Sequence, residues 1–190
     1  FDGNGDYLTS GTSATLKNML TQSFTVSGWV RPTDFKTYGV RLFCTGGGVS
    51  GFNATNGIQV LVQTGATGAM DLQIVNSARS ASVSLTSSKL MSLNAWNHFV
   101  AQVDVENGLW GVGVNGVMEY AAKPVFGVPS STPAACVATI PGEAGNSTFA
   151  LAGHMDDLRV VVGTAIYTQD NYRVPTAPDT FPTATPAMAS

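Results

Sequence analysis

At 190 residues and a formal net charge of −3, the chain is long enough for one domain with its own core. Its 44% hydrophobic content excludes wholesale disorder, and its 11% charged residues amid many small turn-forming ones disfavour a helical bundle. The 9 Lys and Arg are scattered, which excludes a nucleic-acid partner, and no apolar run reaches the ~20 residues of a membrane helix, so we expect no membrane partner either.

Alternating apolar and polar residues predict short strands in the first half of the chain. Helical spacing between Leu16 and Leu20 first predicts a turn or two of helix. In the next segment, 23–31, Phe24 and Val26 share one side of a strand. Further strands are predicted over 40–44, 58–62, 70–74 and, more weakly, 82–86.

The clearest signal in the chain is a three-strand meander between residues 96 and 122. Alternating apolar residues predict its strands, and Asn107-Gly108 and Asn115-Gly116 predict its turns, because Asn-Gly accepts the positive φ angles of tight hairpins. A long irregular loop with several prolines is predicted over 123–146. Strands are then predicted over 147–152 and 155–162.

These elements predict an all-β, two-sheet antiparallel β-sandwich over residues 1–162. Residues 163–190 carry repeated prolines, which cannot donate to a strand ladder, so we expect an extended Pro-rich C-terminal segment packing on the sandwich or on a neighbour. Because the chain begins at Phe1 rather than Met, we expect a processed product or a part of a longer protein.

A series of motifs resembles laminin-G-like (LamG) domains of the concanavalin A-like superfamily. FDGNGDYL (1–8) resembles their opening strand, and FTVSGWVRP (24–32) resembles an F-T-x-x-x-W-V-x-P signature. WNHFVA (96–101) resembles their W-x-H strand, VGVNG (112–116) the hairpin after it, and GHMDDLRV (153–160) their closing G-x-I-D-D-x-R strand. The resemblance implies a jelly roll of two curved sheets whose rim loops bind glycans, proteins or other surfaces.

A looser resemblance concerns the C-terminal part of the chain. GTAIY (163–167) and VPTAP (174–178) resemble versions of the domain in capsid-surface and tail-fibre proteins of bacteriophages. This implies a non-catalytic module on a virion surface, of the decoration, head-fibre or tail-fibre type. Its expected partners are a viral capsid or tail protein and cell-surface or environmental glycans, and a homo-oligomer stays open. The alternatives are a secreted or cell-surface carbohydrate-binding module and a glycoside hydrolase of the same fold.

The acidic residues do not form the pattern of a glycosidase. Such enzymes place two carboxylates on either side of the scissile bond, and related families carry them on one strand as E-x-D-x-E. Glu106, Glu119 and Glu143 belong to no such strand. Asp156 and Asp157 are adjacent, and successive strand residues point to opposite faces. We therefore expect no enzymatic activity.

Asp2 and Asp156 are candidate ligands of a structural calcium, the one cofactor that the resemblance implies. Asp156 matches the closing-strand aspartate that binds calcium in laminin-G-like relatives, and Asp2 lies near it if the first and last strands pair as in that family. Calcium prefers such oxygen ligands. The alternative, which the residues favour, is that both carboxylates accept hydrogen bonds from turn amides.

The candidate ligand-binding residues in the rim loops are Tyr38, Phe52, Asn53 and Asn56. They combine aromatic platforms with amides for sugar hydroxyls; the alternative is a loop with one aromatic pinned to the core. The tryptophans match core or near-core positions of the family, which makes them poor candidates for sugar stacking: Trp29, Trp96 and Trp110.

Two further features keep two interpretations each. Cys44 and Cys136 are either free thiols or a disulfide. Gly111 and Gly113 lie on the face of their strand opposite Trp110, where the lack of side chains lets a neighbouring chain or loop lie flat, or only relieves twist.

Overall fold

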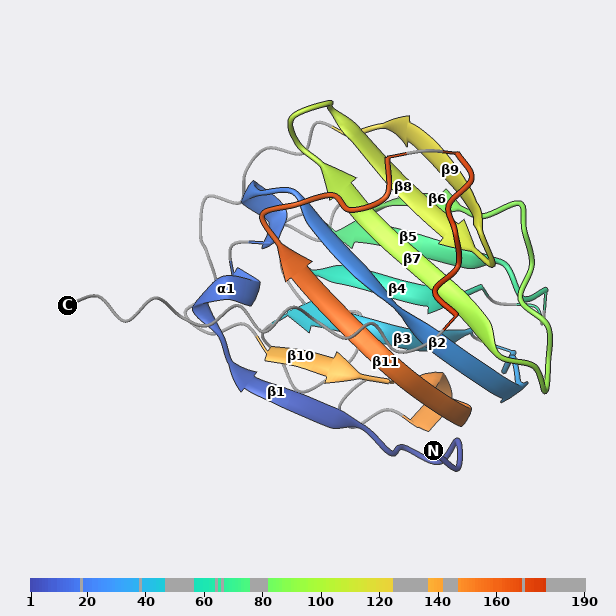
Figure 1. The fold of residues 1–190 in the computed structure, drawn as a ribbon. Coiled ribbons are helices and arrows are strands. Elements are labelled where there is room, and N and C mark those ends of the chain that lie inside the picture. Colours follow the sequence, from blue (N-terminus) through green and yellow to red (C-terminus); the bar gives the residue numbers. More distant parts are fainter. Residues whose placement is uncertain are drawn as a thin grey trace.

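The computed structural model describes residues 1–17, 19–37, 39–46, 57–63, 65, 67–75, 82–124, 137–141, 147–168 and 170–176. It confirms the predicted all-β sandwich of two antiparallel sheets (Figure 1). The strands are β1 (Leu8–Thr12), β2 (Phe24–Asp34), β3 (Val40–Gly46), β4 (Ile58–Val62), β5 (Met70–Val75), β6 (Ser82–Thr86), β7 (Asn97–Asp104), β8 (Leu109–Val114), β9 (Val117–Ala122), β10 (Val137–Ile140) and β11 (Ala152–Val162). The helical turns are α1 (Ala14–Lys17) and the 3-10 turns Met19–Thr21 and Ser147–Phe149.

The two sheets bury their alternating apolar residues against each other. One sheet has the order β11-β2-β7-β8-β9 and the other β1-β10-β3-β4-β5-β6. In β2 the inward residues Phe24, Val26 and Val30 are fully buried, and in β4 every second residue from Ile58 to Val62 is fully buried. Because side chains alternate along a strand, the intervening residues of β2 face away from the core, on what we call the outer face of the five-stranded sheet.

The predicted meander is confirmed as β7-β8-β9. Asn115 and Gly116 connect β8 to β9 with φ angles of 48° and 91°. This is the conformation for which Asn-Gly was expected. Phe99 pairs with Val114, and the same register carries on to Asp104 opposite Leu109.

Two predictions for residues 123–152 were wrong. Residues 147–149 form a 3-10 turn, not the start of a strand, because this turn places the Phe149 ring 3.7 Å from the Arg41 guanidinium and buries Leu151. The predicted irregular loop contains β10, which pairs with β1 and with β3. A four-residue strand carries too little alternation to be seen in a Pro- and Ala-rich stretch.

Candidate functional site

The C-terminal segment, residues 163–168 and 170–176, crosses the outer face of the five-stranded sheet (Figure 1). Thr25 Oγ1 donates to the carbonyl of Thr164 at 3.1 Å and accepts from the amide of Ile166 at 3.0 Å. The Gln102 side chain binds both backbone groups of Tyr167, as a neighbouring strand would. Thr25 and Gln102 are therefore buried, although both face away from the core.

Aromatic side chains hold the second half of the C-terminal segment. His98 is 2% exposed, and its Nδ1 lies 2.9 Å from the hydroxyl of Tyr172. The Tyr172 ring lies 4.7 Å from that of Tyr167, and burial raises the pKa of the Tyr172 hydroxyl. Burial, followed by the charges of Asp170 and Asp104, raises the pKa of Tyr120 to about 12.

The same segment accounts for one of the glycine positions. A Cβ on Gly113 would lie 2.3 Å from the sulfur of Met118 and 3.1 Å from the Tyr172 ring. A Cβ on Gly111 would lie 2.8 Å from the Tyr120 ring. The side-chain-free face thus accommodates side chains of this chain itself, Met118 and Tyr120 of β9 and Tyr172 of the C-terminal segment.

Outside the area that the C-terminal segment covers, Trp96 projects into solvent. Its side chain is 45% exposed, whereas Trp110 is 5% exposed and Trp29 is half-buried. The prediction that all these tryptophans occupy core or near-core positions was therefore wrong for Trp96. Trp96 stands one residue before β7 begins, outside the sandwich interior.

The loop that carries Trp96 is held by hydrogen bonds. The Asn97 side chain accepts from the amide of Ser92 at 2.9 Å and donates to the carbonyls of Ser92 and Ala95. The Asn94 amide donates to the carbonyl of Pro32 at 2.8 Å, which ties the loop to the end of β2. An exposed tryptophan on a pre-organised loop loses little conformational entropy on binding.

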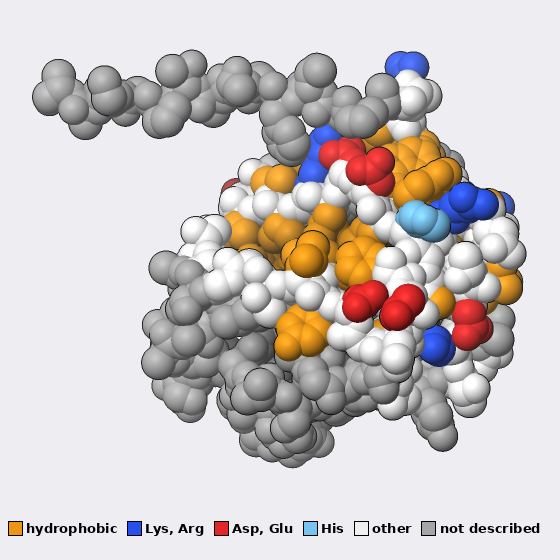
Figure 2. Space-filling view, turned by 90° about the horizontal axis from the view of Figure 1, so that it is seen from below, with side chains coloured by type: hydrophobic (Ala, Val, Ile, Leu, Met, Phe, Trp, Pro, Cys, Tyr) orange, Lys and Arg blue, Asp and Glu red, His pale blue; other side chains and the backbone are white. Residues whose placement is uncertain are grey.

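Two charged or titratable side chains flank Trp96, and a third lies further along the same sheet face. His154 pairs with Arg31 across β11 and β2, and the His154 and Trp96 ring centroids lie 6.4 Å apart at 58°. Continuing the register of β2 and β7 by one residue sets Arg31 beside Trp96. Asp156, opposite Trp29, follows on the same face of β11. Figure 2 shows this end of the molecule, where a histidine lies among hydrophobic and basic side chains. We call Arg31, Trp96, His154 and Asp156 the outer patch.

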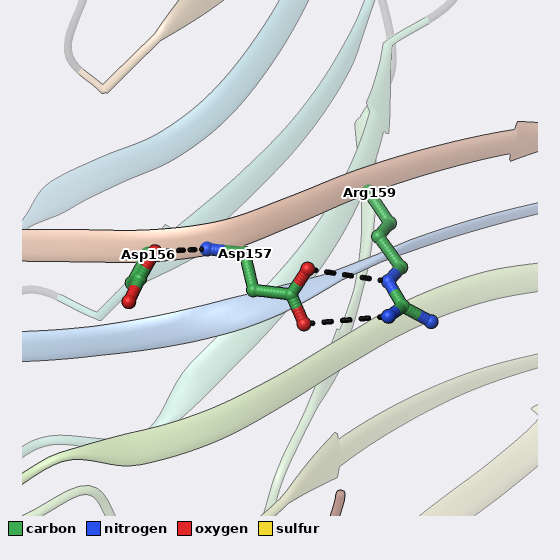
Figure 3. A network of polar contacts seen from close by, with 3 residues as sticks. All are labelled: Asp156, Asp157 and Arg159. Carbon is green, nitrogen blue, oxygen red and sulfur yellow. Dashed lines mark hydrogen bonds and ion pairs between the residues drawn. The ribbon is translucent and has the colours of Figure 1, made fainter. Parts of the chain in front are cut away.

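A β-bulge in β11 sets the direction of Asp156. The register shifts between Asp156 and Arg159, and Asp157 has a φ of 46°. Because of the extra residue, Asp156 faces outward while Val160 and Val162 still face the core. Asp157 forms an ion pair with Arg159 at 3.4 Å, and its amide donates to Asp156 (Figure 3). Asp156 is the carboxylate that remains exposed in the outer patch.

The two candidate calcium ligands both accept backbone amides. Asp2 Oδ1 accepts from the amide of Asn4 at 2.7 Å, and Asp156 Oδ1 accepts from Asp157 at 2.8 Å. Asp2 bridges to Ala152, so the first residues do lie beside β11. Asp156 stands four residues further along, about 13 Å at the rise of a strand. Asp2 thus makes the turn contact of the alternative interpretation, whereas Asp156 accepts from an amide at the bulge of β11. The calcium site stays a prediction.

The other predicted site residues fall elsewhere. The rim-loop candidates lie outside the described residues: Tyr38, Phe52, Asn53 and Asn56. Cys136, the second of the two cysteines, also lies outside the described residues. Glu119 accepts from the amide of Ser88 at 2.7 Å, and Glu106 lies in an exposed turn.

Within the described residues, no three His, Cys, Asp or Glu side chains gather as a metal ion would need. No helix of that part of the chain has the length and apolarity to cross a membrane.

The outer face of the six-stranded sheet offers a second polar region, but it is closed. Arg41 is 3% exposed, its Nε donates to Gln59 at 3.1 Å, and the Phe149 ring covers its guanidinium. Burial lowers the pKa of this guanidinium. Arg41 therefore lies too deep to meet a large ligand, whereas the outer patch is accessible.

With the sandwich and the outer patch described, the family can be stated. A family model described as the concanavalin A-like lectin/glucanases superfamily matches residues 2–164. The chain belongs to this superfamily. The match ends at the start of the C-terminal segment, so most of the residues that cover the concanavalin A-like sheet lie beyond it.

Solved structures share the concanavalin A-like fold at low sequence identity. A Ruminococcus gnavus IT-sialidase module, CBM40, bound to alpha2,3 sialyllactose is 16% identical with a TM-score of 0.60, over 80% of this chain and 84% of that one. A tailspike protein 2 domain of bacteriophage CBA120 is 12% identical with a TM-score of 0.57, over 85% of this chain and 24% of that one.

A third similar structure is the heptameric SAP-like pentraxin of Limulus polyphemus, which is 16% identical with a TM-score of 0.52. It is matched over 73% of this chain and 63% of its own length, so this chain spans less than two thirds of the pentraxin. No curated protein sequence matches the chain.

Sequence reasoning missed Arg31, Trp96 and His154 as site residues. The resemblance of the W-x-H motif predicts a core or near-core tryptophan, whereas β7 begins only at Asn97 and Trp96 is exposed. One signal was available, because Ser92 and Asn94, residue types common in loops, stand shortly before Trp96.

Proposed function

We propose that this domain is a non-catalytic module that binds glycans through the outer patch. The observation that carries the proposal is the 45% exposed Trp96 on a loop held by the Asn97 side chain. A sugar ring has an apolar face that packs on an aromatic side chain, and hydroxyls that need nearby donors and acceptors. Arg31 supplies donors and Asp156 an acceptor on the same sheet face.

The arrangement of acidic groups supports binding rather than hydrolysis. Glycosidases need two carboxyl groups facing each other across the sugar. In the outer patch Asp156 is the exposed carboxylate, and the adjacent Asp157 is engaged by Arg159. The sialyllactose-bound module described above has the same fold, which supports a glycan-binding role for the scaffold.

A glycan array followed by calorimetry tests the proposal. We expect the protein to bind at least one glycan, and Trp96→Ala to weaken that binding by about tenfold or more, since aromatic packing contributes on the order of 1.4 kcal/mol. Tyr7→Ala is the matched control, because Tyr7 is an aromatic residue with 42% exposure far from the outer patch in the sequence. A blank array, or equal losses in both variants, would contradict the proposal.

We further propose that the module works on a virion surface, attached to a capsid or tail protein. Two observations favour this setting over a secreted or cell-surface binding module: the phage-like segments GTAIY and VPTAP, and the fold shared with the CBA120 tailspike domain. Mass spectrometry of purified virions from the source of the gene would detect the chain at a fixed copy number. Its absence from particles would leave the cellular binding module as the better hypothesis.

A further inference from the structure

The Arg31 side chain is anchored at one end and exposed at the other. Its Nε donates to the carbonyl of Asn94 at 3.1 Å, and the residue as a whole is exposed. Within the described residues, Arg31 forms no ion pair. The ion pair on this sheet face joins Arg159 and Asp157. An arginine held at Nε keeps the paired Nη groups oriented, and this planar fork matches a carboxylate better than a hydroxyl.

Arg31 lies between the two rings of the outer patch. His154 is its partner on β11, and Trp96 follows on the side of β7. Directly opposed residues on neighbouring strands have Cβ atoms about 5 Å apart. A sugar ring packed on Trp96 therefore carries its substituents within reach of the Arg31 guanidinium.

The second charge of the patch gives the bound sugar a direction. Asp156 lies two residues from His154 on the same face of β11, about 6.6 Å along the strand. Its Oδ1 already accepts from the Asp157 amide, and it repels an anionic group placed beside it. An acidic substituent thus points toward Arg31, while a hydroxyl can donate to Asp156.

We infer that the outer patch selects glycans whose terminal sugar carries a carboxylate, with Arg31 as the group that binds it. The inference rests on the proposed glycan-binding function and names its ligand class. Trp96 holds the ring, Arg31 binds the carboxylate through paired hydrogen bonds, and Asp156 accepts from a hydroxyl.

Calorimetry with two matched pairs of sugars tests this: 3′-sialyllactose against lactose, and glucuronic acid against glucose. We expect the acidic member of at least one pair to bind about tenfold more tightly, because charge-assisted hydrogen bonds are stronger than neutral ones. The preference should weaken with added salt. Arg31→Gln should remove it, so that within this variant the acidic member binds no more tightly than the neutral one.

Two control variants separate charge from position. Lys89→Gln also removes an exposed positive charge, but outside the outer patch, and it should keep the preference. Asp156→Asn should also keep it, with the acidic sugar bound as tightly as before or more tightly. Thermal unfolding of each variant checks that the fold is intact.

The outcomes distinguish this inference from the function on which it rests. Equal binding of acidic and neutral members, lost in Trp96→Ala, would overturn the carboxylate assignment and leave glycan binding in place. So would an acid preference that survives in Arg31→Gln. No binding of any of the four sugars, together with a blank array, would overturn both.

Discussion

The covered and the exposed parts of the five-stranded sheet's outer face differ in what their side chains do. In the covered part, Thr25, Gln102 and His98 are buried because the C-terminal segment lies over them. In the exposed part, Arg31 and His154 lie on the same strands or their neighbours and remain in solvent.

The difference shows that a polar outward residue has two possible roles in this sheet. Where the chain folds back, such residues act as hydrogen-bond partners for an added segment, and they stabilise the fold. Where it does not, similar residues are free to meet a ligand. Variants in the covered part should therefore change stability, and variants in the outer patch should change binding.

The largest effect is expected from removing residues 163–190. This deletes the hydrogen bonds from Thr25, Gln102 and Tyr120 and uncovers His98. We expect a loss on the order of 3–5 kcal/mol in the free energy of unfolding, measured by urea denaturation. Ending the chain after Thr176 instead keeps every contact described above and serves as the control. Equal stability of the two truncations with the full chain would show that the C-terminal segment is not part of the fold.

Alkaline pH should weaken the same contacts without a mutation. The pKa of Tyr120 is raised from about 10 in the unfolded chain to about 12 in the folded one, and that of Tyr172 is raised as well. Raised tyrosine pKa values contribute stability that is complete below about pH 10 and lost as the pH rises through the folded values. Stability measured from pH 9 to 12 should fall in this window, by no more than the truncation costs. Tyr172→Phe should flatten part of the decline, and an unchanged profile in that variant would contradict the assignment.

Gln102→Leu should cost about 1–3 kcal/mol in the free energy of unfolding. The substitution leaves the amide of Tyr167 without its side-chain partner beneath the C-terminal segment, while the Tyr167 carbonyl keeps the hydrogen bond from the Tyr120 hydroxyl. An orphaned amide costs roughly 1–3 kcal/mol, less where water reaches it. Gln73→Leu is the matched control on the other sheet, where Gln73 makes one exposed 3.3 Å contact with Ser84. Similar unfolding midpoints for the two variants would contradict the expectation that polar residues beneath the C-terminal segment stabilise the fold more than polar residues elsewhere.

The smallest effect on stability is expected from Arg31→Gln, within about 0.5 kcal/mol, since Arg31 is exposed and its side chain donates one hydrogen bond, to the carbonyl of Asn94. The same variant should abolish the preference for acidic sugars. A large loss of stability would move Arg31 from the binding region to the structural one. Differential scanning calorimetry at neutral pH makes this measurement.

Much of the sandwich could be predicted from local patterns. The alternation in Phe24–Val30 and the Asn115-Gly116 turn of the meander are local signals, since each depends on a strand's two faces or on one turn's φ angles. The turn at Asn107-Gly108 is longer than predicted, because it spans residues 105–108 and only Gly108 has a positive φ. The helical spacing at Leu16–Leu20 likewise corresponds to α1 and the 3-10 turn after it. β10 and the 3-10 turn at Ser147–Phe149 were misjudged because their conformations depend on pairing with β1 and β3 and on packing against Arg41.

By itself, the sequence determined which residues alternate between the two faces of each strand, and hence an antiparallel sandwich with Phe24, Val103 and Val112 inside. Only the tertiary structure decided what covers each outer face. Exposure of a residue such as Trp96 depends on whether a distant segment, here residues 163–176, crosses above it, and strand periodicity carries no information about contacts so far apart in the chain.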